Sequence, residues 1–276
     1  MVVPPGADEA IEAYFAAVDA EAPGLVEGIY LVGSVALDDF HPGASDIDFV
    51  AVTGDVLSDA DVAALERAHV ALTPYLRRQF FDGLYVTWRD LGDDPARSRP
   101  GACVEQNRLR RRVAGTGDPV AWHTLASRGV TVRGPRREEV RIWTDRTVLA
   151  AWTHRNLDEY WRVWLRRSSR LRSRPGLATL APTGPVWGVL GVSRLHYTLA
   201  TGRITSKRGA GEYARQAFDV RWQRIVDECL RIRTGAPGRS RYRSPLHRRR
   251  DALDFVAMAI EDAHRIDDFA GPDVDE

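Results

Sequence analysis

Lysine is almost absent from this sequence of 276 residues, because Lys207 is the only one. Arginine supplies the rest of the positive charge, and a preference for arginine says nothing about mechanism by itself. A single retained lysine, in contrast, indicates a position where a compact ammonium group works and a planar guanidinium does not. We therefore treat Lys207 as a candidate site residue.

Other absences exclude whole classes of protein. The two cysteines, Cys103 and Cys229, lie far apart and match no zinc-ligand spacing, so we expect structural thiols in a reducing cytoplasm. No apolar run is long enough to cross a bilayer, and the first residues lack the basic and apolar regions of a secretory signal. The 39 basic and 38 acidic residues nearly cancel, whereas proteins that hold long nucleic acids usually show a basic excess. We expect a cytoplasmic protein with no nucleic-acid partner and no membrane partner, and we take it to be a monomer.

The pattern of expected elements changes near residue 145. Before that point, helices are expected at 7–22, at 58–72 and from Asp118 to Gly129. Strands are expected at 28–33, 46–53 and 84–88. A polar, arginine-rich loop follows at 90–112, and a short run at 130–135 closes this half. After it, helices are expected at 145–172, 186–201, 210–218, 222–233 and 245–265. We predict an α+β chain: an α/β-type N-terminal domain with a small mixed sheet, residues 1–145, followed by an all-α helical-bundle domain, residues 146–276.

The segment GSVALDDFHPGASDID, residues 33–48, carries the pattern that predicts chemistry. Asp46 and Asp48 are two apart at the start of an expected strand, so both carboxylates project to one face. Two neighbouring carboxylates repel each other unless a cation lies between them, and Mg²⁺ favours one or two carboxylates together with substrate phosphates. Gly33 lets the backbone approach a phosphate, and the Ser34 hydroxyl and the N–H groups after it can point at the phosphate oxygens. The segment therefore predicts a site that holds a metal ion and a triphosphate together.

Each of these residues also has a structural interpretation, in which Asp46 caps a turn and Ser34 caps a helix. That interpretation leaves their grouping around one strand–loop–strand unit unexplained. The motif resembles the nucleotidyltransferase superfamily that includes DNA polymerase beta, whose signature is Gly-Ser, a variable gap and Asp-x-Asp. The resemblance implies that Gly33, Ser34 and Ser45 contact the nucleotide, and that Asp46 and Asp48 are catalytic and bind the metal.

A second resemblance rests on VSRLHYTLATGRITSKRGAGEYA, residues 192–214. It is similar to the helical domain of the aminoglycoside 3''/9-adenylyltransferases, bacterial enzymes that inactivate streptomycin and spectinomycin. That family carries an arginine before an aromatic helix, then Ala-x-Thr-Gly-x-Ile and a lysine, which correspond here to Arg194, Ala200, Thr201, Gly202, Ile204 and Lys207. The resemblance implies that Arg194 and Lys207 contact the ATP phosphates, in agreement with the retention of the single lysine.

The sequence departs from that family in its third strand, where the family has a glutamate that acts as general base. In the matching run, LYVT, Tyr85 stands in the place of the glutamate, and Asp82 and Asp90 are expected to face away from the Tyr85 side. Tyrosine, with an unperturbed pKa near ~10, is a poor base at neutral pH. We name Glu105, in the segment after the strand, as the candidate catalytic base.

A second departure is Gly184, which stands where the family has an aspartate that binds the cationic antibiotic. Aminoglycosides are polycations, so their pocket needs acidic groups. Asp158 and Glu159 on the expected long helix, together with Glu105, are the acidic residues that could take over that role.

We predict a Mg²⁺-dependent nucleotidyltransferase that moves AMP from ATP to a hydroxyl of a small molecule, foremost an aminoglycoside of the streptomycin or spectinomycin type, which would give antibiotic resistance. ATP, the co-substrate, and Mg²⁺ are expected to bind between the two domains. Two alternatives stay open: another acceptor such as a protein hydroxyl, and a weakly active nucleotide-binding homologue that lacks the usual base. An RNA-tailing polymerase is disfavoured by the near-neutral charge, and YRSPLHRRRD, residues 242–251, is interpreted as a helix start with a solvated arginine face.

Overall fold

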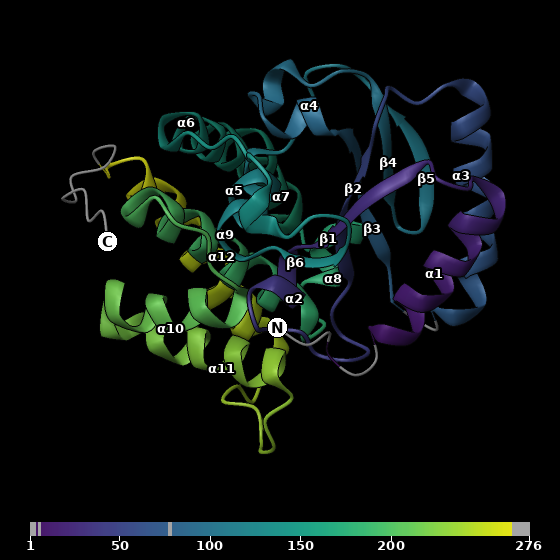
Figure 1. Cartoon of the computed structure of the whole chain (residues 1–276). Coiled ribbons are helices and arrows are strands. Elements are labelled where there is room, and N and C mark those ends of the chain that lie inside the picture. Colours follow the sequence, from purple (N-terminus) through teal and green to yellow (C-terminus); the bar gives the residue numbers. More distant parts are fainter. Residues whose placement is uncertain (1–3, 5–6, 77–78, 267–276) are drawn as a thin grey trace. The chain divides into compact units, whose positions relative to one another are not determined.

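The structure is a computed structural model that describes Pro4, residues 7–76 and residues 79–266. The chain folds as two compact units, Met1–Thr144 and Asp145–Glu276. The strands of the first unit are β1 Val26–Leu31, β2 Ile47–Thr53, β3 Phe81–Thr87, β4 Gly101–Glu105, β5 Arg108–Arg112 and β6 Val130–Arg133 (Figure 1). Its helices are α1 Asp8–Glu21, α2 Gly33–Ala36, α3 Asp59–Leu72, α4 Trp88–Leu91 and α5 Pro119–Arg128.

The first unit is built on one six-stranded mixed sheet with the order β5-β4-β3-β2-β1-β6. Strands β2 and β3 run parallel, and every other neighbouring pair is antiparallel. Alternation along β2 sends Ile47 and Phe49 into a core shared with α1 and α3, and sends Val50 and Val52 into a second core shared with α4 and α5. The sheet is therefore covered by helices on both faces, as alternating strands and helices predict.

Helix boundaries in this unit follow the capping residues of the sequence. Ser58 caps α3 in a capping box with Asp61, as its position before the helical pattern indicated. Asp118 caps α5, where Pro119 occupies the first turn and Gly129 follows the last. These two predictions are confirmed.

The prediction of a polar loop over residues 90–112 is wrong, because the segment holds the hairpin of β4 and β5. Gln106 and Asn107 connect the two strands with φ values of 52° and 61°, a left-handed pair that suits a two-residue hairpin turn. Neither residue is glycine, and the sequence RLRRR of β5 shows a single apolar residue, so the segment lacks the usual strand pattern. Strand β3 also begins at Phe81, earlier than the predicted residue 84.

The second unit is helical, which confirms the predicted α+β class of the whole chain. Its helices are α6 Arg146–Asn156, α7 Arg162–Ser169, α8 Arg174–Ala178, α9 Thr183–Thr201, α10 Lys207–Ala217, α11 Gln223–Thr234 and α12 Pro245–Ala263. A π-helical turn, Leu157–Trp161, joins α6 to α7. Helix α9 packs against α6, α10, α11 and α12, so the core of this unit forms around it. In the described part of the chain, no helix has the length and apolarity that a membrane span requires.

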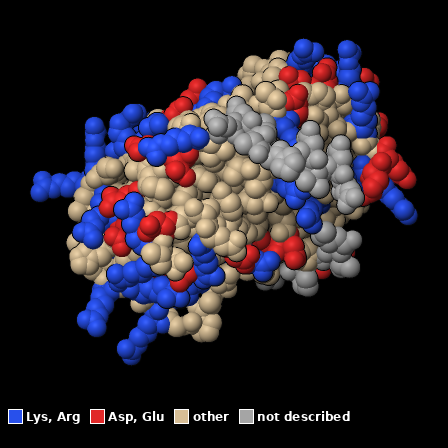
Figure 2. Space-filling view, turned by 90° about the vertical axis from the view of Figure 1, so that its left-hand side faces the viewer, with Lys and Arg blue, Asp and Glu red and all other residues tan. Residues whose placement is uncertain are grey.

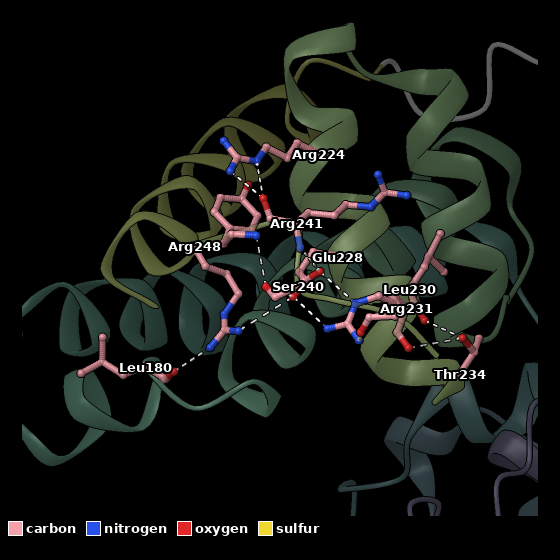
Figure 3. Close-up of polar contacts among 11 residues, drawn as sticks. Leu180, Arg224, Glu228, Leu230, Arg231, Thr234, Ser240, Arg241 and Arg248 are labelled. Atoms are coloured by element: carbon pink, nitrogen blue, oxygen red, sulfur yellow. Dashed lines mark hydrogen bonds and ion pairs between the residues drawn. The ribbon is translucent and has the colours of Figure 1, made fainter. Parts of the chain in front are cut away.

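Glu228, a fully buried carboxylate on α11, holds the loop 235–244 against the helices (Figure 3). It accepts hydrogen bonds from Arg231, from the Ser240 hydroxyl at 2.6 Å and from the backbone N–H of Arg241 at 3.0 Å. Burial acts to raise the pKa of Glu228, but these hydrogen bonds outweigh it and lower the pKa to about 2. Arg248 lies 3.9 Å from the same carboxylate and is itself buried, so the predicted solvated face of residues 248–250 is wrong for this residue.

Candidate active site

Gly33 and Asp48 lie in direct contact where β1 ends and β2 begins. The backbone N–H of Val32 donates to the Asp48 carbonyl at 2.9 Å, which joins the two segments. Gly33 has a φ of +56°, and a Cβ at this position would lie 1.9 Å from Oδ2 of Asp48. Only glycine therefore permits both this turn and this position of the Asp48 carboxylate.

The residues after Gly33 and before Asp48 brace each other. The Ser34 hydroxyl donates to the Asp46 carbonyl at 3.4 Å, and Oδ1 of Asp46 accepts from the backbone N–H of Phe80 at 3.4 Å. Ser45 is buried, and its hydroxyl accepts from the backbone N–H of His41 at 3.0 Å. The structure therefore brings Ser34, Asp46 and Asp48 together at one edge of the sheet and places Ser45 inside the loop that supports them.

A third carboxylate, Asp82, lies on the same face of the sheet as Asp48. In the parallel pair of β2 and β3, Asp48 is the register partner of Asp82. The residues that alternate with them, Val50 and Leu84, both pack in the core shared with α5. The side chain of Asp82 accepts backbone hydrogen bonds from the hairpin turn, with distances of 2.9 Å from the Gln106 nitrogen and 3.0 Å from the Asn107 nitrogen.

Tyr85 faces away from this carboxylate pair. It is 1% exposed and lies in the core shared with α1 and α3, where its hydroxyl is 2.5 Å from the Tyr14 hydroxyl and 2.8 Å from Nε2 of His69. Burial raises the pKa of Tyr85 well above its ordinary value and lowers that of His69 to about 4. The prediction that Tyr85 takes the position of the family's base is thus wrong. Asp82 and Tyr85 do face opposite sides of the sheet, as strand alternation predicts, but it is Asp82 that shares a face with Asp48.

Glu105, the predicted base, ends β4 on the side of Asp82. The antiparallel register pairs Gly83 with Val104, and its continuation by one residue sets Glu105 beside Asp82. The side chain of Glu105 is 65% exposed and lies 4.0 Å from Nε of Arg110. Three strands therefore each contribute a carboxylate to one face and one edge, although a catalytic role for Glu105 stays a prediction.

The oxygens at this edge fit a hard divalent cation. Magnesium needs only one or two protein carboxylates when phosphates supply further oxygens, and Asp46 and Asp48 offer that set. Gly33 leaves the space next to Asp48 that a side chain would fill. Among the described residues, no three His, Cys, Asp or Glu side chains converge as ligands of one ion.

In the second unit, Arg194 and Lys207 flank the loop that joins α9 to α10. Gly202 ends α9 with a φ of 65°, and Nε of Arg194 donates to the carbonyl of Thr205 at 3.2 Å. Lys207 is the first residue of α10, which Ser206 caps. The N-terminus of a helix favours anions, and two cationic side chains next to it strengthen that preference.

Aromatic side chains lie next to Lys207. Its Nζ is 5.1 Å from the centre of the Trp187 ring, and Nε1 of Trp187 donates to the Tyr160 hydroxyl at 3.1 Å. Trp187 and Tyr160 are 45% and 44% exposed, so an apolar surface is available beside the ammonium group. The contact between Trp187 and Lys207 could not be predicted, since nothing in the sequence shows that α9 turns Trp187 toward α10.

Gly184 has no room for the aspartate of the resembling family. A Cβ at this position would lie 2.6 Å from Cα of Thr179 and 2.7 Å from the Ala178 carbonyl oxygen. Of the acidic residues named as substitutes, Asp158 forms an ion pair with Arg162 at 2.6 Å, and its Oδ1 lies 3.2 Å from Nε2 of His264. Recognition of a cationic acceptor therefore cannot depend on an aspartate at position 184.

Comparison with known proteins gives matches in both units. Residues 13–80 match a family model described as a nucleotidyltransferase domain, and residues 167–257 match one described as the C-terminal domain of aminoglycoside adenylyltransferase. These matches confirm the resemblance drawn from the two sequence motifs. No curated protein matches the chain by sequence.

Ten solved chains match the structure. One of them is spectinomycin adenyltransferase AAD(9) from Enterococcus faecialis, whose crystal structure contains ATP and spectinomycin. It shares 11% sequence identity with this chain, the match covers 92% of this chain and 99% of that one, and the TM-score is 0.66. At this identity, the likeness concerns the fold.

Proposed function

We propose that this chain, a nucleotidyltransferase similar to the aminoglycoside adenylyltransferases, transfers AMP from ATP to a hydroxyl group of an aminoglycoside of the streptomycin or spectinomycin type. The observation that carries the proposal is the contact of Gly33 with Asp48. It supports a site in which the turn at Gly33 would hold a phosphate next to a carboxylate that would hold the metal. The neighbour of similar fold, which contains ATP and spectinomycin, supports the choice of both substrates.

Asp46 and Asp48 would hold Mg²⁺, which when bound would polarise the α-phosphate and balance charge on the departing pyrophosphate. Gly33 and Ser34 would lie along the phosphates, with Ser45 supporting their loop. The acceptor hydroxyl would attack the α-phosphorus in line, so that a new P–O bond forms as the bond to pyrophosphate breaks. The protein mainly positions the two substrates, which is the larger part of catalysis in this kind of reaction.

Arg194 and Lys207 would bind the ATP phosphates beside the N-terminus of α10. Lys207 presents a compact charge, and the Arg194 guanidinium is fixed by its bond to the Thr205 carbonyl. If both cations act on the phosphates, Lys207→Ala should raise the KM for ATP and lower kcat, since charge on the leaving group grows in the transition state. Lys207→Arg should recover only part of the loss, and full recovery would show that charge alone matters.

We assign the general base to Glu105, with Asp82 as the alternative. The carboxylate of Glu105 is exposed, whereas both oxygens of Asp82 already accept backbone N–H groups of the hairpin turn. General base catalysis contributes about 10²–10⁴-fold, so Glu105→Gln should lower kcat by that factor. The same result for Asp82→Asn, with Glu105→Gln active, would transfer the role to Asp82.

The reaction can be tested directly. The protein is incubated with ATP, Mg²⁺ and a panel of aminoglycosides, and each compound is examined by mass spectrometry for the gain of one adenylyl group. We expect a modified aminoglycoside with wild-type protein and a much smaller yield with Asp48→Asn. Pyrophosphate release without any modified aminoglycoside would discard the antibiotic as acceptor.

The fit of Gly184 favours a second candidate, a nucleotidyltransferase that modifies a protein hydroxyl. At this position the resembling family has an aspartate that binds the cationic antibiotic. Here the backbone of Thr179 leaves no room for such a side chain. In a cell lysate, label from α-labelled ATP would then appear on protein. Label confined to small molecules would exclude this candidate. ATP binding without pyrophosphate release under any of these conditions would instead support a nucleotide-binding homologue of low activity.

A further inference from the structure

The near-neutral charge of the chain conceals a division between its two units. Residues 145–276 contain 24 of the 39 basic and 16 of the 38 acidic side chains, a formal charge of +8, whereas residues 1–144 carry −7. A general preference for arginine would act on both units alike, so it does not explain this division. The basic excess is a property of the helical unit.

Two segments of the helical unit contain basic residues and no acidic ones. Residues 160–211 include ten arginine or lysine residues without one aspartate or glutamate, and residues 229–250 include eight arginines, again without an acid. Arg194 and Lys207, which we assign to ATP, account for two of these eighteen residues. Several others have partners within the unit, namely Arg162, Arg231, Arg241, Arg248, Arg249 and Arg250. The exposed arginines that form no ion pair need another explanation.

Arginines of the first segment are exposed on α7, in the connection 170–173 and at the start of α8. The exposed set is Arg166, Arg167, Arg170, Arg172 and Arg174. Within the described residues, none of these five guanidinium groups takes part in an ion pair. In the second segment, Arg239 and Arg243 are exposed in the loop 235–244 that Glu228 holds in place.

The two segments are joined by two arginines of α12. Arg249 donates to the carbonyls of Ser168 and Ser169 at the end of α7 and to the Thr179 hydroxyl after α8. Arg248 donates to the Leu180 carbonyl at 2.7 Å and lies 3.9 Å from the carboxylate of Glu228 (Figure 3).

The ends of α7 and α8 and the loop 235–244 thus flank Arg248 and form one surface, which we call the arginine surface. It consists of the five exposed residues of the first segment together with Arg239 and Arg243. Figure 2 shows one face of the molecule, on which Lys and Arg side chains (blue) stand out in several groups among a smaller number of Asp and Glu side chains (red).

We propose that the arginine surface binds the phosphate backbone of a polynucleotide. In the part of the chain that the structure describes, none of these seven arginines forms an ion pair. Their like charges repel one another, and a chain of phosphates relieves this repulsion at several points at once. The arrangement is extended, because it includes two segments on either side of Arg248, which suits a polymer better than a single phosphate group. The expectation that no nucleic acid binds relies on the net charge of the whole chain. That net charge is uninformative, because the two units carry opposite charges that nearly cancel.

An anionic membrane is the other polyanionic partner to consider. Leu171 and Leu177 are 40% and 54% exposed beside the arginines of α7 and α8. Around Arg239, residues 235–240 are otherwise glycine, alanine, proline and serine, so the tip of this loop presents no large apolar side chain to a bilayer. Leu246, which is 52% exposed, lies beyond the loop in the first turn of α12. The observations therefore favour phosphates contacted by arginine alone.

Binding can be measured by fluorescence anisotropy with a labelled single-stranded RNA of roughly 20 nucleotides, between about 50 and 200 mM salt. We expect micromolar binding to wild-type protein with a strong dependence on salt. The variant R166Q/R170Q/R174Q should bind at least about tenfold more weakly and lose about 2 from the slope of log K against log [salt], since each single-strand contact contributes about 0.7.

The matched control is R155Q/R221Q/R265Q, which removes three exposed arginines of the same unit outside both acid-free segments. It should keep nearly the whole slope. Equal losses in both triple variants would overturn the proposal, because the effect would then come from net charge and not from this surface. Absence of RNA binding at about 50 mM salt would also overturn it.

Anionic vesicles serve as the competing partner. Binding to phosphatidylserine vesicles that exceeds RNA binding, and that Leu171→Ser and Leu177→Ser abolish, would assign the surface to a membrane and reject the proposal. The thermal midpoint of each variant shows whether it is folded. AMP transfer to an aminoglycoside should be unchanged in R166Q/R170Q/R174Q, so failure of RNA binding and failure of the proposed reaction remain distinguishable.

Discussion

Replacing Gly33 by alanine should disable the site while leaving the fold largely intact. The added Cβ would lie 1.9 Å from Oδ2 of Asp48, whereas an ordinary contact begins at 3.4 Å, so the carboxylate must retreat by about 1.5 Å. A misplacement of about 1 Å at a reacting centre can cost about 10²-fold in rate. We therefore expect Gly33→Ala to lower kcat/KM by about 100-fold or more, equivalent to roughly 2.7 kcal/mol of transition-state stabilisation.

The backbone strain of this change can be separated from the clash. Gly43, in the same loop, also has a positive φ of +77°, but a Cβ there would meet nothing within 4 Å. Gly43→Ala should therefore lose about 1–2 kcal/mol of stability, as Gly33→Ala does, yet keep its activity. The free energies of unfolding come from urea titration, and kcat/KM comes from pyrophosphate release.

A double variant tests whether Gly33 acts through Asp48. If it does, Gly33→Ala/Asp48→Asn should be no less active than Asp48→Asn alone, since the second change has nothing left to displace. If the two substitutions instead lowered kcat/KM independently, so that their separate factors multiplied in the double variant, the reasoning would be refuted. It would also be refuted by a Gly33→Ala enzyme within about threefold of wild-type activity, or by an equal loss of activity in Gly43→Ala.

Three further predictions concern His69, Glu228 and Gly184. Burial lowers the pKa of His69 to about 4, so unfolding takes up a proton between about pH 6.5 and 4. The free energy of unfolding should therefore fall by roughly 3 kcal/mol as pH decreases through this window. Urea titrations at both ends of the window should show a smaller decrease in His69→Gln. Glu228→Gln should lower stability by about 3–5 kcal/mol near pH 7, because two arginines lose their counter-charge, while exposed Glu261→Gln should not. The loss should shrink as pH falls below about 4.5 toward 2, where the wild-type carboxyl itself becomes protonated, and a difference that is constant over that range would contradict the assignment. Gly184→Asp should lower the thermal midpoint without improving streptomycin binding. Gly184→Ala should lower the midpoint almost as much, because the backbone of Thr179 leaves no space for a Cβ. A stable Gly184→Asp variant that binds streptomycin more tightly would contradict this prediction.

Those parts of the fold that depend on local chemistry can be predicted from the sequence. The capping residues Ser58 and Asp118 mark their helices correctly, and the Gly33–Asp48 segment predicts which residues approach one another at the sheet edge. The hairpin of β4 and β5 escapes prediction because its turn uses Gln106 and Asn107 in left-handed conformations that glycine more commonly adopts.

Asp82 escapes prediction for a different reason. Its expected face depends on Tyr85, whose own place comes from resemblance to a family motif and not from strand register. Whether a residue faces a site depends on pairing with a strand far away in the sequence, here Asp48 in β2, and that pairing cannot be deduced from either strand alone. The exposed arginines of α7 and α8 illustrate a related limit, because whole-chain charge averages over two units of opposite sign.

The parallel pairing of β2 with β3 has a consequence for how this site can change. Because the ladder between the two strands fixes Asp48 opposite Asp82, the connecting segment 54–80 can lengthen or shorten without separating the two carboxylates. A single residue inserted between Asp48 and Val50 would instead turn the start of β2 over, sending the carboxylate into the apolar layer beneath α1 and α3. Insertions and deletions among natural variants should therefore accumulate in the connecting segment 54–80 and be absent from the first residues of β2 and β3.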